Sequence, residues 1–150
     1  MMLEKLPPEE KAYEAFSVLA DHRIEMHENY AHVSSSDRTK VYEVRWQDHT
    51  YCSTDSATYW QGYPGYPVIA VLIKQGRLPS NEQAEQIMQG INWKQMNEKH
   101  KHNYAEALKE VLDILTAKGV DVTPTEDLAR AVNTALGSLD IEVKKCRRKY

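Results

Sequence analysis

Apolar side chains recur at helical spacing in the first part of the chain. Ala12, Phe16, Leu19 and Ala20 fall on one face of a helix with about 3.6 residues per turn. The preceding residues, 6–10, include two prolines and two acidic residues, which suit the first turn of a helix. The pattern therefore predicts a helix that ends near Ala20.

The period changes to two after this helix. Apolar and polar residues alternate over 24–33 and 41–46, and a third short run with strand character covers 50–53. Six of the nine tyrosines lie between Tyr30 and Tyr66, as is typical of a small sheet with aromatic cross-strand pairs. This part of the chain predicts three antiparallel strands joined as a meander.

Helical signals dominate from Pro67 onward. Residues 67–76 carry an apolar stripe that ends at a glycine, and capping-box sequences at 80–83 and 123–126 open two further helices. Between them, residues 92–119 predict one long helix with an apolar face.

These segments together predict an α+β protein. It would consist of an N-terminal helix, a three-stranded antiparallel meander, a helix and an all-helical C-terminal half. We expect two parts: residues 1–79, and a helical extension over 80–150 that packs on the first part and ends in a basic tail.

Composition adds few constraints. Of the 150 residues, 41% are apolar and 27% are charged, which is ordinary for a globular domain. The longest apolar run, 68–73, is too short to span a bilayer, and the N-terminal residues do not resemble a signal peptide. We therefore expect a cytoplasmic protein without a membrane partner. In that setting Cys52 and Cys146 are expected to be free thiols.

Charge is distributed unevenly along the chain. The net charge of −3 argues against broad affinity for nucleic acid, which usually needs a strongly basic surface. Basic residues nevertheless crowd the last positions, namely Lys144, Lys145, Arg147, Arg148 and Lys149. Such a run is typical of a solvated tail, and an arm that contacts phosphates is the alternative.

The middle of the chain has the order of a known small module. A strand at 42–46 precedes Cys52-Ser53-Thr54, ten residues follow, and Gly65-Tyr66-Pro67 leads directly into the apolar helix that begins at Val68. Strand, Cys-x-Cys, about ten residues, Cys-x-His and an apolar helix is the order of the SWIM zinc finger. Residues 22–78 resemble this family, and the resemblance implies binding of DNA or protein.

The ligand positions of that family are almost all replaced. Cys52 is kept, whereas Thr54, Gly65 and Pro67 occupy the other three positions and do not bind zinc. No metal and no cofactor are therefore expected here. We expect an aromatic cluster to close this corner in place of the metal, formed by Tyr51, Tyr59, Trp60, Tyr63 and Tyr66.

One set of acidic and histidine residues would have metal-ligand spacing on a helix. Asp21, Glu25, Glu28 and His32 would share a helical face. Because residues 24–33 are predicted as a strand, Glu28 and His32 are expected to point to one side and Asp21 and Glu25 to the other. The strand prediction therefore separates this set.

A second set lies on the predicted long helix. Glu98, His102 and Glu106 follow one another at intervals of four, and Glu110 continues the series. With a divalent metal they would give a small hydrolase, which is the alternative function. A solvated face with weak ion pairs is the other interpretation.

The sequence thus predicts a non-catalytic interaction module. A protein partner or self-association, with a homodimer through the helical half, is favoured over nucleic acid by the acidic net charge. The residues expected to contact a protein are Tyr59, Trp60, Tyr63 and Tyr66. The residues expected to contact nucleic acid are Arg45, Arg77, Lys144, Lys145, Arg147 and Arg148.

Overall fold

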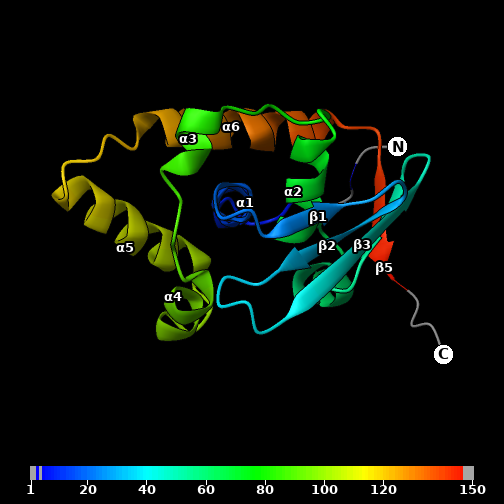
Figure 1. Cartoon of the computed structure of the whole chain (residues 1–150), viewed down its shortest axis with the longest axis horizontal. Helices are drawn as coiled ribbons and strands as arrows, with labels where there is room; N and C mark the ends of the chain where they lie inside the picture. The colour runs from blue at the N-terminus through cyan, green and yellow to red at the C-terminus, as the bar shows by residue number, and fades with distance from the viewer. Residues whose placement is uncertain (1–2, 4, 147–150) are drawn as a thin grey trace.

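The computed structural model describes residue 3 and residues 5–146. Helices and a five-stranded mixed sheet confirm the α+β class (Figure 1). The elements are α1 (Glu10–Ala20), β1 (Ile24–Met26), β2 (Tyr30–Ser34), β3 (Val41–Gln47), β4 (Thr50–Ser53), the π-helix η1 (Ala57–Gln61), α2 (Tyr66–Lys74), α3 (Glu82–Gln86), α4 (Trp93–Lys99), α5 (Tyr104–Ala117), α6 (Thr123–Ser138) and β5 (Glu142–Lys145).

The sheet has two strands more than the sequence predicted. Its order is β1-β2-β3-β4-β5, and the first three pairings are antiparallel. Residues 24–33, predicted as one strand, form the β1–β2 hairpin instead, with the backbone N–H of His27 donating to the carbonyl of Tyr30 at 2.8 Å. The alternation of apolar and polar residues continues through the turn, so a period of two does not show where one strand ends and the next begins.

The fifth strand comes from the predicted basic tail. β5 pairs in parallel with β4, in a register that places Cys52 opposite Lys144 and Ser53 opposite Lys145. Lysines are common on the exposed edge of a sheet, where they discourage pairing with other chains. Arg147, Arg148 and Lys149 lie outside the described residues.

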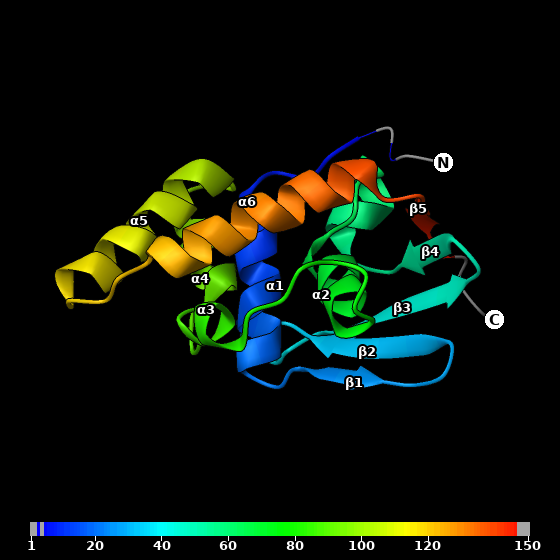
Figure 2. The ribbon, with the colours of Figure 1, turned by 90° about the horizontal axis from the view of Figure 1, so that it is seen from above.

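The core is built around α1 and α2. α2 contacts β1, β3 and β4 on one face of the sheet, and α1 packs on α2. α1 is enclosed on most sides, because α3, α5 and α6 also contact it; Figure 2 shows α6 crossing over it before the chain returns to β5. Ser17 of α1 accepts a hydrogen bond from Nε1 of the buried Trp93 at 2.8 Å. This bond ties α4 to the centre of the molecule.

The predicted long helix over 92–119 is wrong. It is interrupted between α4 and α5, where Lys101 and His102 have φ of 53° and 63°. The side chain of Asn103 accepts the backbone N–H of Glu106 at 3.2 Å and caps α5. A left-handed turn followed by a capping asparagine stops one helix and starts the next.

A charged cluster is buried where α1 meets α4 and α5. The Lys11 ammonium donates to Glu14 Oε2 at 2.8 Å, lies 3.6 Å from Glu10 Oε1, and sits 3.8 Å from the centre of the Tyr104 ring. Glu10 is 1% exposed, and among the described residues neither of its carboxylate oxygens has a hydrogen-bond partner. Burial, and then repulsion by Glu14, raise the pKa of Glu10. Burial alone would lower the pKa of Lys11, but attraction by Glu14 and Glu10 outweighs it and raises that pKa.

None of the described helices combines the length and the apolar character that crossing a bilayer requires.

Candidate functional site

A buried aspartate closes the corner between β4 and α2. The hydroxyl of Ser53 donates to Asp55, and the backbone N–H of Thr58 donates to Asp55 Oδ2 at 3.0 Å. Thr58 Oγ1 in turn accepts the backbone N–H of Gly65 at 3.0 Å. Burial of Asp55 raises the pKa of its carboxyl group. The corner expected to be closed by aromatic packing is therefore held by a polar network as well, which the sequence analysis missed.

Gly65 lies against this network without room for a side chain. A Cβ atom here would overlap Asp55 Oδ2 and lie 3.2 Å from the Cβ of Ala57. Gly65→Ala is expected to lower the free energy of unfolding by about 1–3 kcal/mol, because the buried carboxylate must move. Urea unfolding followed by circular dichroism measures the change.

Gly137 in α6 provides the matched control. Its nearest neighbour to an added Cβ is Leu6, at 3.8 Å. Gly137→Ala is expected to leave the protein as stable or to stabilise it by up to about 1 kcal/mol, through helix propensity. Equal effects of the two substitutions would contradict the close contact at Gly65.

The aromatic residues of this corner divide into two groups. Tyr51 and Tyr63 are buried, and Tyr66 packs edge-on against Tyr42 with ring centres 6.2 Å apart. Burial raises the pKa of Tyr66. These rings contribute to the core, so Tyr63 and Tyr66 offer little surface to a partner.

Tyr59 and Trp60 lie outside the core, on η1. Trp60 is 75% exposed and contacts the edge of Tyr59, with ring centres 4.7 Å apart. The ammonium of Lys145 lies 5.1 Å from the centre of the Tyr59 ring, and that of Lys5 lies 3.4 Å from Gln61 Oε1. We call Lys5, Tyr59, Trp60 and Lys145 the aromatic–lysine corner. It combines Tyr59 and Trp60 from the predicted protein-contact set with Lys145 from the predicted nucleic-acid set, because β5 packs on η1.

Within the described part of the chain, the other predicted basic residues, Arg45, Arg77 and Lys144, do not gather into one surface. Arg45 Nε lies 2.9 Å from Glu43 Oε2, on the face of the sheet opposite to Tyr51. Arg77 donates from Nη1 to the hydroxyl of Tyr51 at 2.9 Å. Lys144 is exposed on β5. Arg45 and Arg77 are thus engaged on opposite faces of the sheet.

The residues of the alternative hydrolase site come from three segments. Glu98 belongs to α4, His102 to the turn and Glu106 to α5, and all three are exposed. Within the described part of the chain, their possible ligand atoms do not lie close enough together to hold one metal ion. Glu110 instead accepts from Lys99 at 2.6 Å, which lowers the pKa of Glu110. Glu98, His102 and Glu106 therefore do not share the face of one helix.

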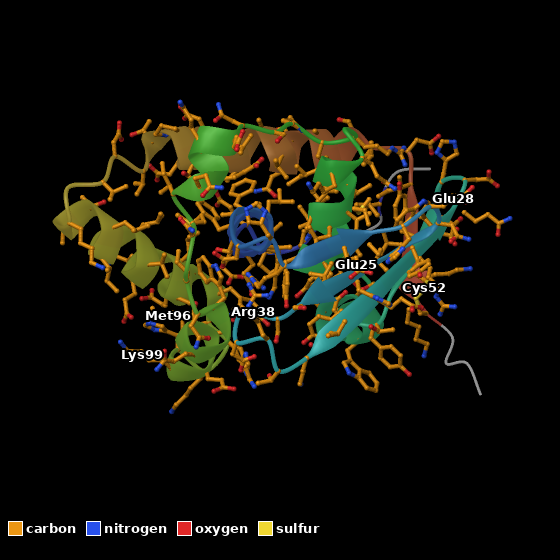
Figure 3. All side chains as sticks on the ribbon, in the orientation of Figure 1. Glu25, Glu28, Arg38, Cys52, Met96 and Lys99 are labelled. Atoms are coloured by element: carbon orange, nitrogen blue, oxygen red, sulfur yellow. A yellow bond between two sulfur atoms is a disulfide. The ribbon has the colours of Figure 1, made fainter. Side chains whose placement is uncertain are left out.

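The outer face of the sheet, which points away from α2, carries a different polar group. Glu25 pairs across the hairpin with His32, and His32 pairs with Glu43. Residues directly opposite in an antiparallel ladder share a face, so Glu25 and His32 point to the same side. The expectation that a strand would separate them is wrong, since they lie on two strands. Figure 3 labels Glu25 on the sheet, away from Lys99 on α4.

The two cysteines form a disulfide. Cys52 on β4 is bonded to Cys146, the residue that follows β5, with Cα atoms 4.7 Å apart (Figure 3). The expectation of free thiols is wrong, because the parallel pairing of β5 brings together residues separated by 94 positions. The bond fixes β5, and hence Lys145, next to η1.

No curated protein matches this chain, and no solved structure does. A family description, "Uncharacterised conserved protein UCP014422", matches residues 4–142 and so covers most of the chain. The chain therefore belongs to the family of uncharacterised conserved proteins UCP014422.

Proposed function

We propose that this protein is a non-catalytic binding module whose contact surface is the aromatic–lysine corner. The observation that carries the proposal is Trp60, an indole 75% exposed on a short π-helix. Tryptophan and tyrosine are enriched among the residues that contribute most to binding, so a side chain exposed to this extent is a strong candidate contact.

The charges around Trp60 indicate the chemistry of the partner. Lys5 and Lys145 lie beside η1, where they contact Gln61 and Tyr59 respectively. The chain as a whole has a net charge of −3, so this corner is a local basic region on an acidic molecule. We infer that the partner is an acidic segment of another protein that also supplies an apolar side chain to Trp60.

The aromatic–lysine corner is also held in place from two sides. The Cys52–Cys146 disulfide holds β5 on one side of it, and the Asp55 network holds the start of η1 on the other. A surface that is rigid before binding loses less conformational entropy when the partner docks. The strand-loop-helix order of this region also fits the proposed resemblance to a SWIM module, with the disulfide and Asp55 in place of zinc.

The disulfide bears on the compartment. Cytoplasmic placement remains a prediction from the sequence. A lasting disulfide, however, fits an oxidising environment better than the reducing cytosol.

The binding test compares the wild type and three variants as baits for proteins of the source cell. Trp60→Ala is expected to weaken a specific interaction by about 2 kcal/mol or more, or about 30-fold in affinity. Lys145→Glu should weaken it too, because it places a negative charge next to an acidic partner. Ile114→Ala, at an exposed apolar residue of α5, is the control and should retain the partner. Quantitative mass spectrometry of the retained proteins gives the result.

Two outcomes would count against the proposal. If all three variants retain the same proteins as the wild type, the corner is not the contact surface. If a single-stranded oligonucleotide binds with an affinity that falls steeply with salt, the partner is nucleic acid, stacked on Tyr59 and Trp60. Sedimentation of the wild type and of Trp60→Ala separately tests whether a homodimer forms through this corner.

A further inference from the structure

Three metal-binding side chains converge on the outer face of the sheet. Glu25 on β1, His27 just after it and His32 on β2 each offer one ligand atom, and these atoms all lie within 4.8 Å of one another. His27 Nε2 is 2.5 Å from Glu25 Oε1. The β1–β2 hairpin creates this group, because it folds residues 25 and 27 back against residue 32.

The two imidazole rings are positioned by an aromatic neighbour. His27 stacks on Tyr30 with ring centres 4.3 Å apart and planes 11° apart, and His32 meets the same ring edge-on at 5.3 Å. The two histidine rings also meet edge-on, with centres 6.1 Å apart, so Tyr30 packs beside both of them and limits the directions in which their nitrogens point. A group that is held in place before the ion arrives needs less ordering on binding.

A carboxylate outside the group holds His32 from the other side. Glu43 Oε1 lies 3.3 Å from His32 Nε2, and Glu43 Oε2 lies 2.9 Å from Arg45 Nε. A carboxylate that orients a ligating imidazole in this way is a recurrent feature of zinc sites, where it raises the basicity of the ligand.

We propose that Glu25, His27 and His32 bind one divalent transition-metal ion, with Zn²⁺ as the best match. Two imidazoles and one carboxylate suit a borderline ion such as Zn²⁺, whereas Ca²⁺ and Mg²⁺ prefer ligand sets made of oxygen. Glu25 and His27 are exposed, so water can complete the coordination. The site is independent of the proposed function, since it shares no residue with the aromatic–lysine corner.

The same side chains have a simpler interpretation, in which they form ion pairs and bind no metal, and the test must distinguish the two. His27 with Glu25, and His32 with Glu43, would form two ion pairs if the rings were protonated. Ion pairs of this kind need no metal and contribute little at a surface.

The experiment titrates ZnCl₂ into untagged, chelator-treated protein and follows the heat of binding. The wild type is expected to bind one ion per chain. His27→Asn and His32→Asn should abolish measurable binding, and Glu25→Gln should weaken it. Glu43→Gln should weaken binding by about 10-fold or more, as expected for a carboxylate that orients a ligand.

His102→Asn is the matched control. It removes an exposed imidazole from the turn between α4 and α5, and asparagine tolerates the left-handed backbone there. Its zinc affinity should equal that of the wild type, and far-UV circular dichroism should show that every variant is folded. The proposal is overturned if the wild type binds no zinc, if His27→Asn and His32→Asn bind it like the wild type, or if CaCl₂ binds as tightly as ZnCl₂.

Discussion

Replacing Lys11 by methionine is expected to lower the free energy of unfolding by about 3–5 kcal/mol. Lys11 is 5% exposed, and its ammonium faces the two carboxylates of Glu10 and Glu14. Methionine fills a similar volume but carries no charge, so both acids stay buried without the ammonium group that faced them. Removing one partner of a buried charge cluster costs more than removing the whole cluster, because the remaining charges stay desolvated.

Chemical unfolding of three further variants separates charge from packing. Lys94→Met breaks an exposed ion pair with Asp37, at 3.2 Å, and should change stability by no more than about 1 kcal/mol. Glu10→Gln should be neutral or stabilising near pH 7, because it removes a buried negative charge that Glu14 repels. Adding Glu10→Gln to Lys11→Met should recover part of the loss. If Lys11→Met resembles Lys94→Met, the buried cluster contributes little.

The pH dependence gives a second measurement of the same cluster. Burial raises the pKa of Glu10 in the folded protein above its unfolded value of about 4.5, so ionising Glu10 costs stability when the protein is folded. The contribution of Glu10 to the free energy of unfolding therefore becomes more favourable as the pH falls from above its folded pKa towards its unfolded pKa. Glu10→Gln should remove this component from a plot of unfolding free energy against pH.

Cleaving the disulfide is expected to lower the free energy of unfolding by about 4–5 kcal/mol. The bond closes a loop with a sequence separation of 94, and a closed loop of that size strongly restricts the unfolded chain. Because Cys52 and Cys146 are the two cysteines of the sequence, a reductant acts on no other bond of this kind. Hydrogen exchange should show the largest loss of protection in β5, which pairs with β4 alone.

Urea unfolding with and without a phosphine reductant measures this effect. The double variant Cys52→Ser and Cys146→Ser should match the reduced wild type and should not respond to reductant. Intact-mass analysis of the oxidised wild type should find two hydrogens fewer than in the reduced protein. A loss below about 1 kcal/mol, or two alkylatable thiols in the untreated protein, would contradict the role assigned to the bond.

Much of the helical structure could be predicted because its signals are local. The apolar stripe of α1 and the continuous apolar run of α2 follow from spacing and from the residues that start each helix. β5 could not be predicted in this way. It is four residues long, carries two lysines, and is stable as a strand only because β4, far away in the sequence, accepts its hydrogen bonds.

The candidate sites show the same limit in a different form. Glu25 and His32 are seven positions apart, an odd number, so a single strand would direct them to opposite faces. Because a turn lies between them, an odd or even spacing in the sequence no longer decides which face each residue occupies. The pairing of the two strands across the hairpin decides it instead. Likewise, the sequence singled out Tyr59, Trp60, Tyr63 and Tyr66 together, but only packing decides which rings are left outside.

The crossover from β4 to β5 sets an order of events during synthesis. The first four strands, η1 and α2 leave the ribosome before the helices that separate them from the last strand. The sheet therefore remains one strand short while more than half of the chain is still being made, and its β4 edge is open to other nascent chains in that interval. A chaperone that covers the β4 edge would act in that interval, whereas an oxidising folding catalyst would act only after Cys146 has emerged to pair with Cys52.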